Sequence, residues 1–135
     1  MLSIENLDAF YGKVPALHGV TITVEEGEVV TLVGANGAGK STLLKAVSGT
    51  VTTTGRMDFN GRSLMGMKPE RVVRQGIVQV PEGRRIFPGI TVVENLEVAS
   101  YAAGRTSAET REELPRVLAI FPSLQARRKS YGWSL

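Results

Sequence analysis

The strongest constraint on this chain is a glycine-rich run that lies between a predicted strand and a predicted helix. Residues 34–41 read Gly-Ala-Asn-Gly-Ala-Gly-Lys-Ser and satisfy the pattern G-x-x-x-x-G-K-[ST]. Residues 29–33 are apolar and rich in β-branched side chains, which predicts a strand buried on both faces of a parallel sheet. Residues 40–47 carry apolar side chains at helical spacing. The order strand, loop, helix is the one in which this pattern binds phosphate.

Each part of the loop has a chemical reason. Glycines let the backbone curl, so that successive N–H groups face phosphate oxygens, and the helix that follows directs its positive end at them. We expect Lys40 to reach the β- and γ-phosphates and to act in catalysis, and the Ser41 hydroxyl to ligate Mg²⁺. The alternative, a flexible glycine-rich connection, is disfavoured by the flanking elements. The predicted nucleotide-binding residues of the loop are Gly34, Ala35, Asn36, Gly37, Ala38, Gly39, Lys40, Ser41 and Thr42.

The other predicted strands are short. Residues 20–24 alternate apolar and polar side chains, and an earlier strand is expected around residues 2–7. Residues 51–61 end in Asn-Gly, a hairpin signal, and predict a short two-stranded excursion. Residues 77–80 are predicted to form a second buried strand.

Three further helices are predicted. One covers about residues 69–75, with Pro69 in its first turn. A second follows the capping box Thr91-Val-Val-Glu94 and ends at Gly104. The third begins near Ser107, and Pro115 is expected either to kink it or to open its second half.

Composition excludes several classes of protein. The chain has 135 residues, no cysteine and one histidine, so it holds one ordinary domain and neither a disulfide scaffold nor a thiolate or His-rich metal site. No window approaches the about 18 apolar residues of a membrane span, and the first basic residue is Lys13, so we expect neither membrane insertion nor a basic-headed signal peptide. The basic run 127–129 is interpreted as a solvated face. Basic and aromatic residues do not interleave, so no nucleic acid partner is expected.

The motifs together resemble a known family. The segments GANGAGKST, YGKVPALHGV and VPEGRRIFPGITVVENL resemble the ATP-binding subunits of ABC transporters, and within these the branched-chain amino-acid importers. The resemblance implies an α/β fold of the phosphate-loop NTPase (ABC ATPase) type, incomplete in this chain. The parts implied are an N-terminal antiparallel β portion, the phosphate-loop strand and helix, and most of a helical subdomain, divided into residues 1–81 and 82–135.

The resemblance also implies roles for individual residues. Tyr11 falls where the family places an aromatic ring that stacks on adenine, whereas the residues alone also allow simple packing against the strand at 20–24. Glu82 stands where most ABC ATPases carry a glutamine that contacts Mg²⁺ and the attacking water. Two roles remain open for Glu82. It either contacts the metal or the water and takes part in catalysis, or it has a loop role at a permease. Arg84 and Arg85 could contact the permease or simply face solvent. His18 does not match the family's catalytic histidine and is interpreted as structural.

The implied cofactors are ATP and Mg²⁺, and the implied partners are a transmembrane permease and a second ABC ATPase subunit, at the cytoplasmic face of the cell membrane. Neither Asp8 nor Asp58 ends an apolar strand, so the acidic residue that holds Mg²⁺ through water in these ATPases is not identified. Residues 134–135 resemble the entry to the family's signature segment. Two hypotheses follow: an ATPase subunit that drives import, of which this is the first part, or a nucleotide-binding or docking module without hydrolytic activity. A GTPase is disfavoured because no Asn-Lys-x-Asp sequence occurs.

Overall fold

A computed structural model describes residues 1–83 and 85–135 of the chain. These residues form two units, Met1–Gln79 and Val80–Leu135. The first unit contains the sheet and the glycine-rich loop, and the second is helical.

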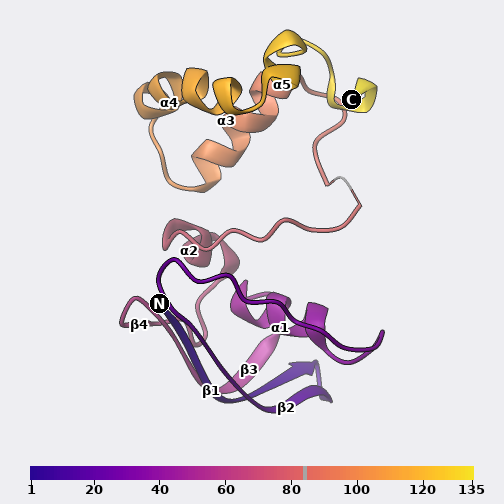
Figure 1. Ribbon diagram of the computed structural model, residues 1–135, viewed down its shortest axis with the longest axis vertical. Coiled ribbons are helices and arrows are strands. Elements are labelled where there is room, and N and C mark those ends of the chain that lie inside the picture. The colour runs from indigo at the N-terminus through magenta and orange to yellow at the C-terminus, as the bar shows by residue number, and fades with distance from the viewer. Residues whose placement is uncertain (84) are drawn as a thin grey trace. The chain divides into compact units, whose positions relative to one another are not determined.

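An antiparallel sheet with strand order β2-β1-β3-β4 organises the first unit (Figure 1). Its strands are β1 (Leu2–Tyr11), β2 (Val14–Val24), β3 (Thr52–Phe59) and β4 (Arg62–Ser63). The strands predicted around residues 2–7 and over 20–24 are confirmed, and they pair with each other, with Ile4 opposite Ile22. The excursion predicted at 51–61 is present as β3 and β4, but β4 begins at Arg62, just past the predicted range, and β3 also pairs along β1 and so belongs to the sheet.

The turn between β3 and β4 follows from its two residues. Asn60 and Gly61 have positive φ angles of 49° and 75°, the backbone conformation that an Asn-Gly hairpin turn requires. The predicted hairpin signal is confirmed at this position.

Two helices complete the first unit. α1 (Lys40–Val47) lies against β1, β2 and β3, and α2 (Pro69–Arg74) begins at the predicted proline. The core forms where α1 covers the sheet, because the apolar faces of both elements exclude water there. Its buried members are Ile4, Leu7, Ala9, Leu43, Ala46, Met57 and Leu64.

The predicted buried strands at 29–33 and 77–80 are wrong in this structure. Both segments are irregular, and Val29, Val33 and Val80 are 92%, 90% and 91% exposed. An apolar run becomes a buried parallel strand only when neighbouring strands bond to both of its edges. Within residues 1–83 and 85–135, no strand pairs with either segment.

The second unit consists of helices α3 (Val92–Ala102), α4 (Ser107–Ile120) and α5 (Pro122–Ala126), followed by one 3₁₀ turn, η1 (Gly132–Ser134). The capping box at Thr91 and Glu94 is confirmed, and a second one, at Thr106 and Glu109, opens α4. Pro115 lies inside α4, which continues past it. Among the described helices, none is both long and apolar enough to cross a membrane.

Candidate functional site

The glycine-rich loop leads directly into α1. Gly37 and Gly39 have φ angles of 86° and 90°, which only glycine adopts readily. Gly39 is the N-cap of α1, no side chain caps that helix, and its first turn holds no acidic residue. The first N–H groups of α1 are therefore not occupied by a capping side chain, and they carry the positive end of the helix dipole.

Lys40 folds back over the loop that precedes it. Its Nζ donates hydrogen bonds to the carbonyl oxygens of Gly34 (2.6 Å) and Ala35 (2.7 Å). The lysine charge thus lies at the first two residues of the loop, while the helix dipole lies at the last one. The loop is bracketed by two sources of positive potential, the arrangement that an anionic group requires.

Ser41 and Thr42, the next two residues of the pattern, lie in different environments. Ser41 is exposed, which leaves its side chain accessible to a bound ion. Thr42 is 8% exposed, and its Oγ1 lies 3.3 Å from the Tyr11 Oη. The Thr42 hydroxyl is therefore committed to Tyr11.

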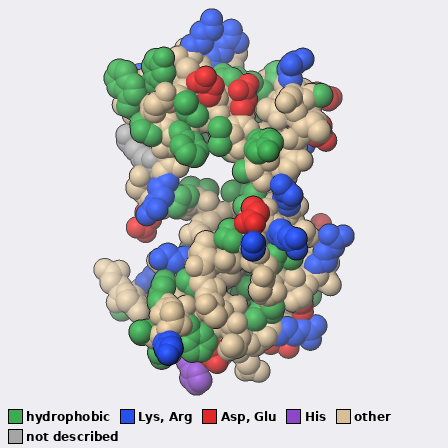
Figure 2. All heavy atoms as spheres, turned by 180° about the vertical axis from the view of Figure 1, so that it is seen from behind, with side chains coloured by type: hydrophobic (Ala, Val, Ile, Leu, Met, Phe, Trp, Pro, Cys, Tyr) green, Lys and Arg blue, Asp and Glu red, His purple; other side chains and the backbone are tan. Residues whose placement is uncertain are grey.

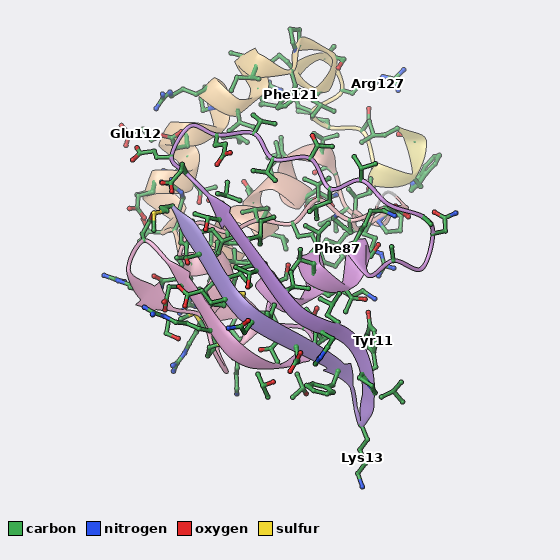
Figure 3. The ribbon with its side chains drawn as sticks, turned by 60° about the horizontal axis from the view of Figure 1, so that its bottom comes forward. Tyr11, Lys13, Phe87, Glu112, Phe121 and Arg127 are labelled. Atoms are coloured by element: carbon green, nitrogen blue, oxygen red, sulfur yellow. The ribbon has the colours of Figure 1, made fainter. Side chains whose placement is uncertain are left out.

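Tyr11 ends β1 and lies beside α1 (Figure 3). The residue is 44% exposed, and Lys45 Nζ donates a hydrogen bond to its Oη at 3.3 Å. Two hydrogen bonds lower the pKa of the Tyr11 phenol below its ordinary value. The one with Thr42 has the larger effect and the one from Lys45 the smaller. A partly exposed ring held by its hydroxyl suits the stacking role predicted for Tyr11.

Glu82 and Arg85 belong to the second unit, and both are exposed. Arg84 lies outside the described residues. A groove of about 480 Å³ is present in this unit. Phe87 is fastened beside it, because its N–H donates to the Asn95 Oδ1 at 2.8 Å and its carbonyl accepts from the Asn95 Nδ2 at 3.0 Å. The groove is lined by Arg85, Ile86, Phe87, Val92, Asn95, Leu96, Val98, Ala99, Ala102, Leu124 and Leu135.

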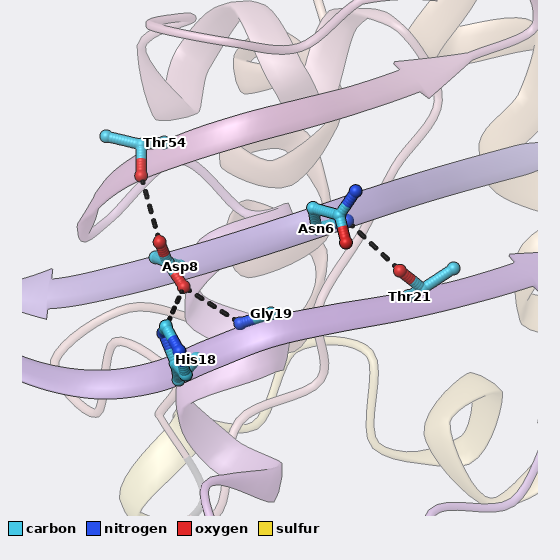
Figure 4. A network of polar contacts seen from close by, with 6 residues as sticks. All are labelled: Asn6, Asp8, His18, Gly19, Thr21 and Thr54. Carbon is cyan, nitrogen blue, oxygen red and sulfur yellow. Dashed lines mark hydrogen bonds and ion pairs between the residues drawn. The ribbon is translucent and has the colours of Figure 1, made fainter.

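Both aspartates of the chain are engaged by other groups. Asp8 Oδ1 accepts a hydrogen bond from the Gly19 N–H (2.8 Å) and lies 2.9 Å from His18 Nδ1 (Figure 4). The Thr54 hydroxyl donates a hydrogen bond to the other carboxylate oxygen, Asp8 Oδ2. The Gly19 N–H is the main cause of a lowered pKa of the Asp8 carboxyl. His18, the single histidine, is a surface residue (Figure 2) whose side chain is 96% exposed. Asp58 pairs with Arg56, so both aspartates already have partners within the first unit.

Comparisons with known proteins decide the family. The sequence pattern of the family described as ABC transporter matches residues 17–132. The chain belongs to the ABC transporter family. The resemblance inferred from the sequence motifs is therefore confirmed.

Individual ABC relatives agree with this assignment. The chain is 41% identical over 128 residues to the high-affinity branched-chain amino acid transport ATP-binding protein BraG of Pseudomonas aeruginosa, covering 94% of this chain and 54% of BraG. A structure titled as the ATP binding subunit of an ABC transporter superposes with a TM-score of 0.80 at 35% identity, over 97% of this chain and 54% of that one. The ADP conformation of MJ1267, an ATP-binding cassette of an ABC transporter, gives a TM-score of 0.78 at 27% identity, over 100% of this chain and 58% of that one.

The chain spans about half the length of the ABC relatives it matches. The α/β fold with its antiparallel sheet is thus the N-terminal part of an ABC cassette, as the sequence predicted. Segments 29–33 and 77–80 are irregular within a chain that represents about half of such a cassette.

Two contacts of Tyr11 beside the loop were not predicted from the sequence. Lys45 and Thr42 hold the phenol of Tyr11, although 34 and 31 residues separate them from it. The only local signal is the spacing of Thr42 and Lys45, which places them on one side of a helix. The position of a tyrosine from another strand carries no local signal.

Proposed function

We propose that this chain binds MgATP through residues 34–42. We also propose that the whole protein is the ATP-binding subunit of an ABC importer. The observation that carries the proposal is the Lys40 ammonium held on the Gly34 and Ala35 carbonyls beside the uncapped start of α1. Lysine charge, helix dipole and glycine backbone converge on one loop. A polyphosphate is the ligand that satisfies all three.

Within this proposal, each residue of the site has a defined task. The loop N–H groups and Lys40 hold the phosphates, and the Lys40 charge also stabilises negative charge that develops during phosphoryl transfer. Ser41 offers one hydroxyl ligand to Mg²⁺, and Tyr11 offers a ring face to adenine. Since Asp8 and Asp58 are engaged elsewhere, the first unit fits a Mg²⁺ held mostly by phosphate oxygens and water, a mode common for this ion.

We also propose that branched-chain amino acids are the transported substrates. BraG, which is named as a branched-chain amino acid transport ATP-binding protein, is 41% identical to this chain over nearly all of the chain's length. Coupling to transport needs a permease, for which the groove beside Phe87 supplies an apolar surface with a charge at its rim. It also needs a second ATP-binding subunit, as the resemblance implies. We therefore propose that the protein works at the inner face of the membrane and that Glu82 contributes either to the metal site or to the permease contact.

Titration calorimetry with MgATP on the folded chain tests the proposal. We expect wild type to bind, Lys40→Ala to bind at least tenfold more weakly, and Lys13→Ala to bind like wild type. Lys13 is a suitable control because it lies at the tip of the β1–β2 hairpin and projects away from Tyr11 (Figure 3). Equal affinities of wild type and Lys40→Ala would contradict the assignment.

A further inference from the structure

The Tyr11 phenol joins the end of β1 to α1. Its Oη lies 3.3 Å from the Thr42 Oγ1 and accepts a hydrogen bond from the Lys45 Nζ, also at 3.3 Å. We propose that Lys45 is a positioning residue: together with Thr42, it fixes the Tyr11 ring relative to the phosphate loop, so that base and phosphates are bound by one pre-arranged surface. This inference rests on the proposed function.

The geometry leaves the ring available for stacking. The Lys45 ammonium is 3.3 Å from the hydroxyl oxygen but 5.2 Å from the ring centroid. It therefore binds the hydroxyl end of the ring and does not cover the centre of a face. The ring remains 44% exposed, and a base stacks on an open aromatic face without special hydrogen bonds.

Both partners of the phenol belong to the helix that begins at the loop. Thr42 and Lys45 are three residues apart and lie on the same side of α1. Thr42 follows Ser41, the expected metal ligand, and is itself buried. A hydrogen bond to α1 therefore fixes the distance between the ring and the phosphate site. Without it, the position of the Tyr11 ring would be set only by the end of the β1–β2 hairpin.

Lys45 itself is exposed, so its replacement tests the contact without disturbing the core. Holding the Tyr11 side chain in its bound position is worth a roughly three- to tenfold gain in affinity. That gain appears only for a ligand that uses the ring. If Lys45 acted only as a nearby positive charge, in contrast, its loss would weaken the binding of every phosphate ligand, with or without a base.

The binding experiment therefore compares MgATP with magnesium tripolyphosphate, which has no base. We expect Lys45→Met to bind MgATP three- to tenfold more weakly and tripolyphosphate unchanged, Lys45→Arg to restore MgATP binding, and Lys13→Met, a matched loss of one lysine, to change neither. An unchanged MgATP affinity of Lys45→Met, or an equal loss for both ligands, overturns the inference while leaving the proposed function intact. Failure of wild type to bind either ligand overturns both.

A spectroscopic titration reports the contact without nucleotide. In a chain carrying Tyr101→Phe and Tyr131→Phe, Tyr11 is the one remaining tyrosine, and phenolate absorbance follows its ionisation. Because Thr42 and Lys45 lower the pKa of the Tyr11 phenol, we expect Lys45→Met to move the titration to higher pH and Lys45→Arg to move it little. A titration that is the same in Lys45→Met and in its parent shows that the contact is absent, and it overturns the inference.

Discussion

Gly39, the residue before α1, lies so close to Leu17 of β2 that a β-carbon at position 39 would overlap the leucine side chain. The glycine also has a φ of 90°. The pattern residue therefore satisfies two requirements at once: the left-handed backbone that turns the loop into the helix, and the close packing of that turn on the sheet.

We predict that Gly39→Ala destabilises the chain more than Gly37→Ala. Both glycines have positive φ, but a β-carbon at Gly37 meets nothing within 4 Å. Backbone strain costs each variant about 1–2 kcal/mol, and at position 39 alone the end of the Leu17 side chain must also shift to make room for the β-carbon, which adds a smaller cost. Urea unfolding of both variants measures the difference, and Leu17→Ala should recover part of it. Equal midpoints for the two variants would show that Leu17 does not restrict this turn.

The capping box of α3 predicts a pH dependence. The Thr91 N–H, and secondarily its hydroxyl, lower the pKa of the Glu94 carboxyl below 4.5. A carboxyl whose pKa is depressed by folding stabilises the fold above its unfolded pKa, and this stabilisation is lost as the pH falls through the folded pKa. Glu94→Gln should therefore lower the unfolding midpoint at pH 7 and converge with wild type in acid.

Two variants sharpen this test of the cap. Thr91→Ala removes the side-chain acceptor and should cost about 1 kcal/mol. Glu97→Gln removes one carboxylate from the exposed side of the same helix and should change the midpoint little. If Glu94→Gln and Glu97→Gln shift the midpoint equally at every pH, the effect is one of net charge and the cap is not its source.

The groove of the second unit predicts a contact with the permease. Ile86 and Phe87 are exposed beside Arg85, and apolar side chains rimmed by charge are typical of contact surfaces. A crosslinker placed at Arg85 of the full-length subunit, in an assembled transporter, should capture the permease. The control site is Glu112, exposed on α4 (Figure 3). Capture from Glu112 but never from Arg85 would rule out this surface.

Local sequence patterns predicted the turns, caps and helix starts correctly, because each of these features depends on residues close together in the chain. The Asn60-Gly61 turn, the Thr91 cap and the start of α1 at Lys40 each depend on residues a few positions apart. Segments 29–33 and 77–80 were predicted wrongly because the burial of a parallel strand depends on distant neighbours. The contacts of Tyr11 with Thr42 and Lys45 were missed for the same reason, since they join a strand end to a helix more than 30 residues away.

The last prediction concerns turnover: the 135-residue chain alone should bind MgATP without steady hydrolysis, whereas the whole protein proposed above should hydrolyse it. Phosphoryl transfer is catalysed by positioning and by electrostatic stabilisation. Asp8 is held by Gly19 and Asp58 by Arg56, so neither is free to order Mg²⁺ or the attacking water.

Two assays check this prediction. Full-length protein should release phosphate over many turnovers under conditions in which the 135-residue chain releases none above the Lys40→Ala background. The exposed apolar segments 29–33 and 77–80 also predict association of the chain with itself, so sedimentation must accompany the assay and identify the species present. Multiple-turnover phosphate release by the chain, abolished in Lys40→Ala, would show that residues 1–135 already contain the groups that the reaction needs.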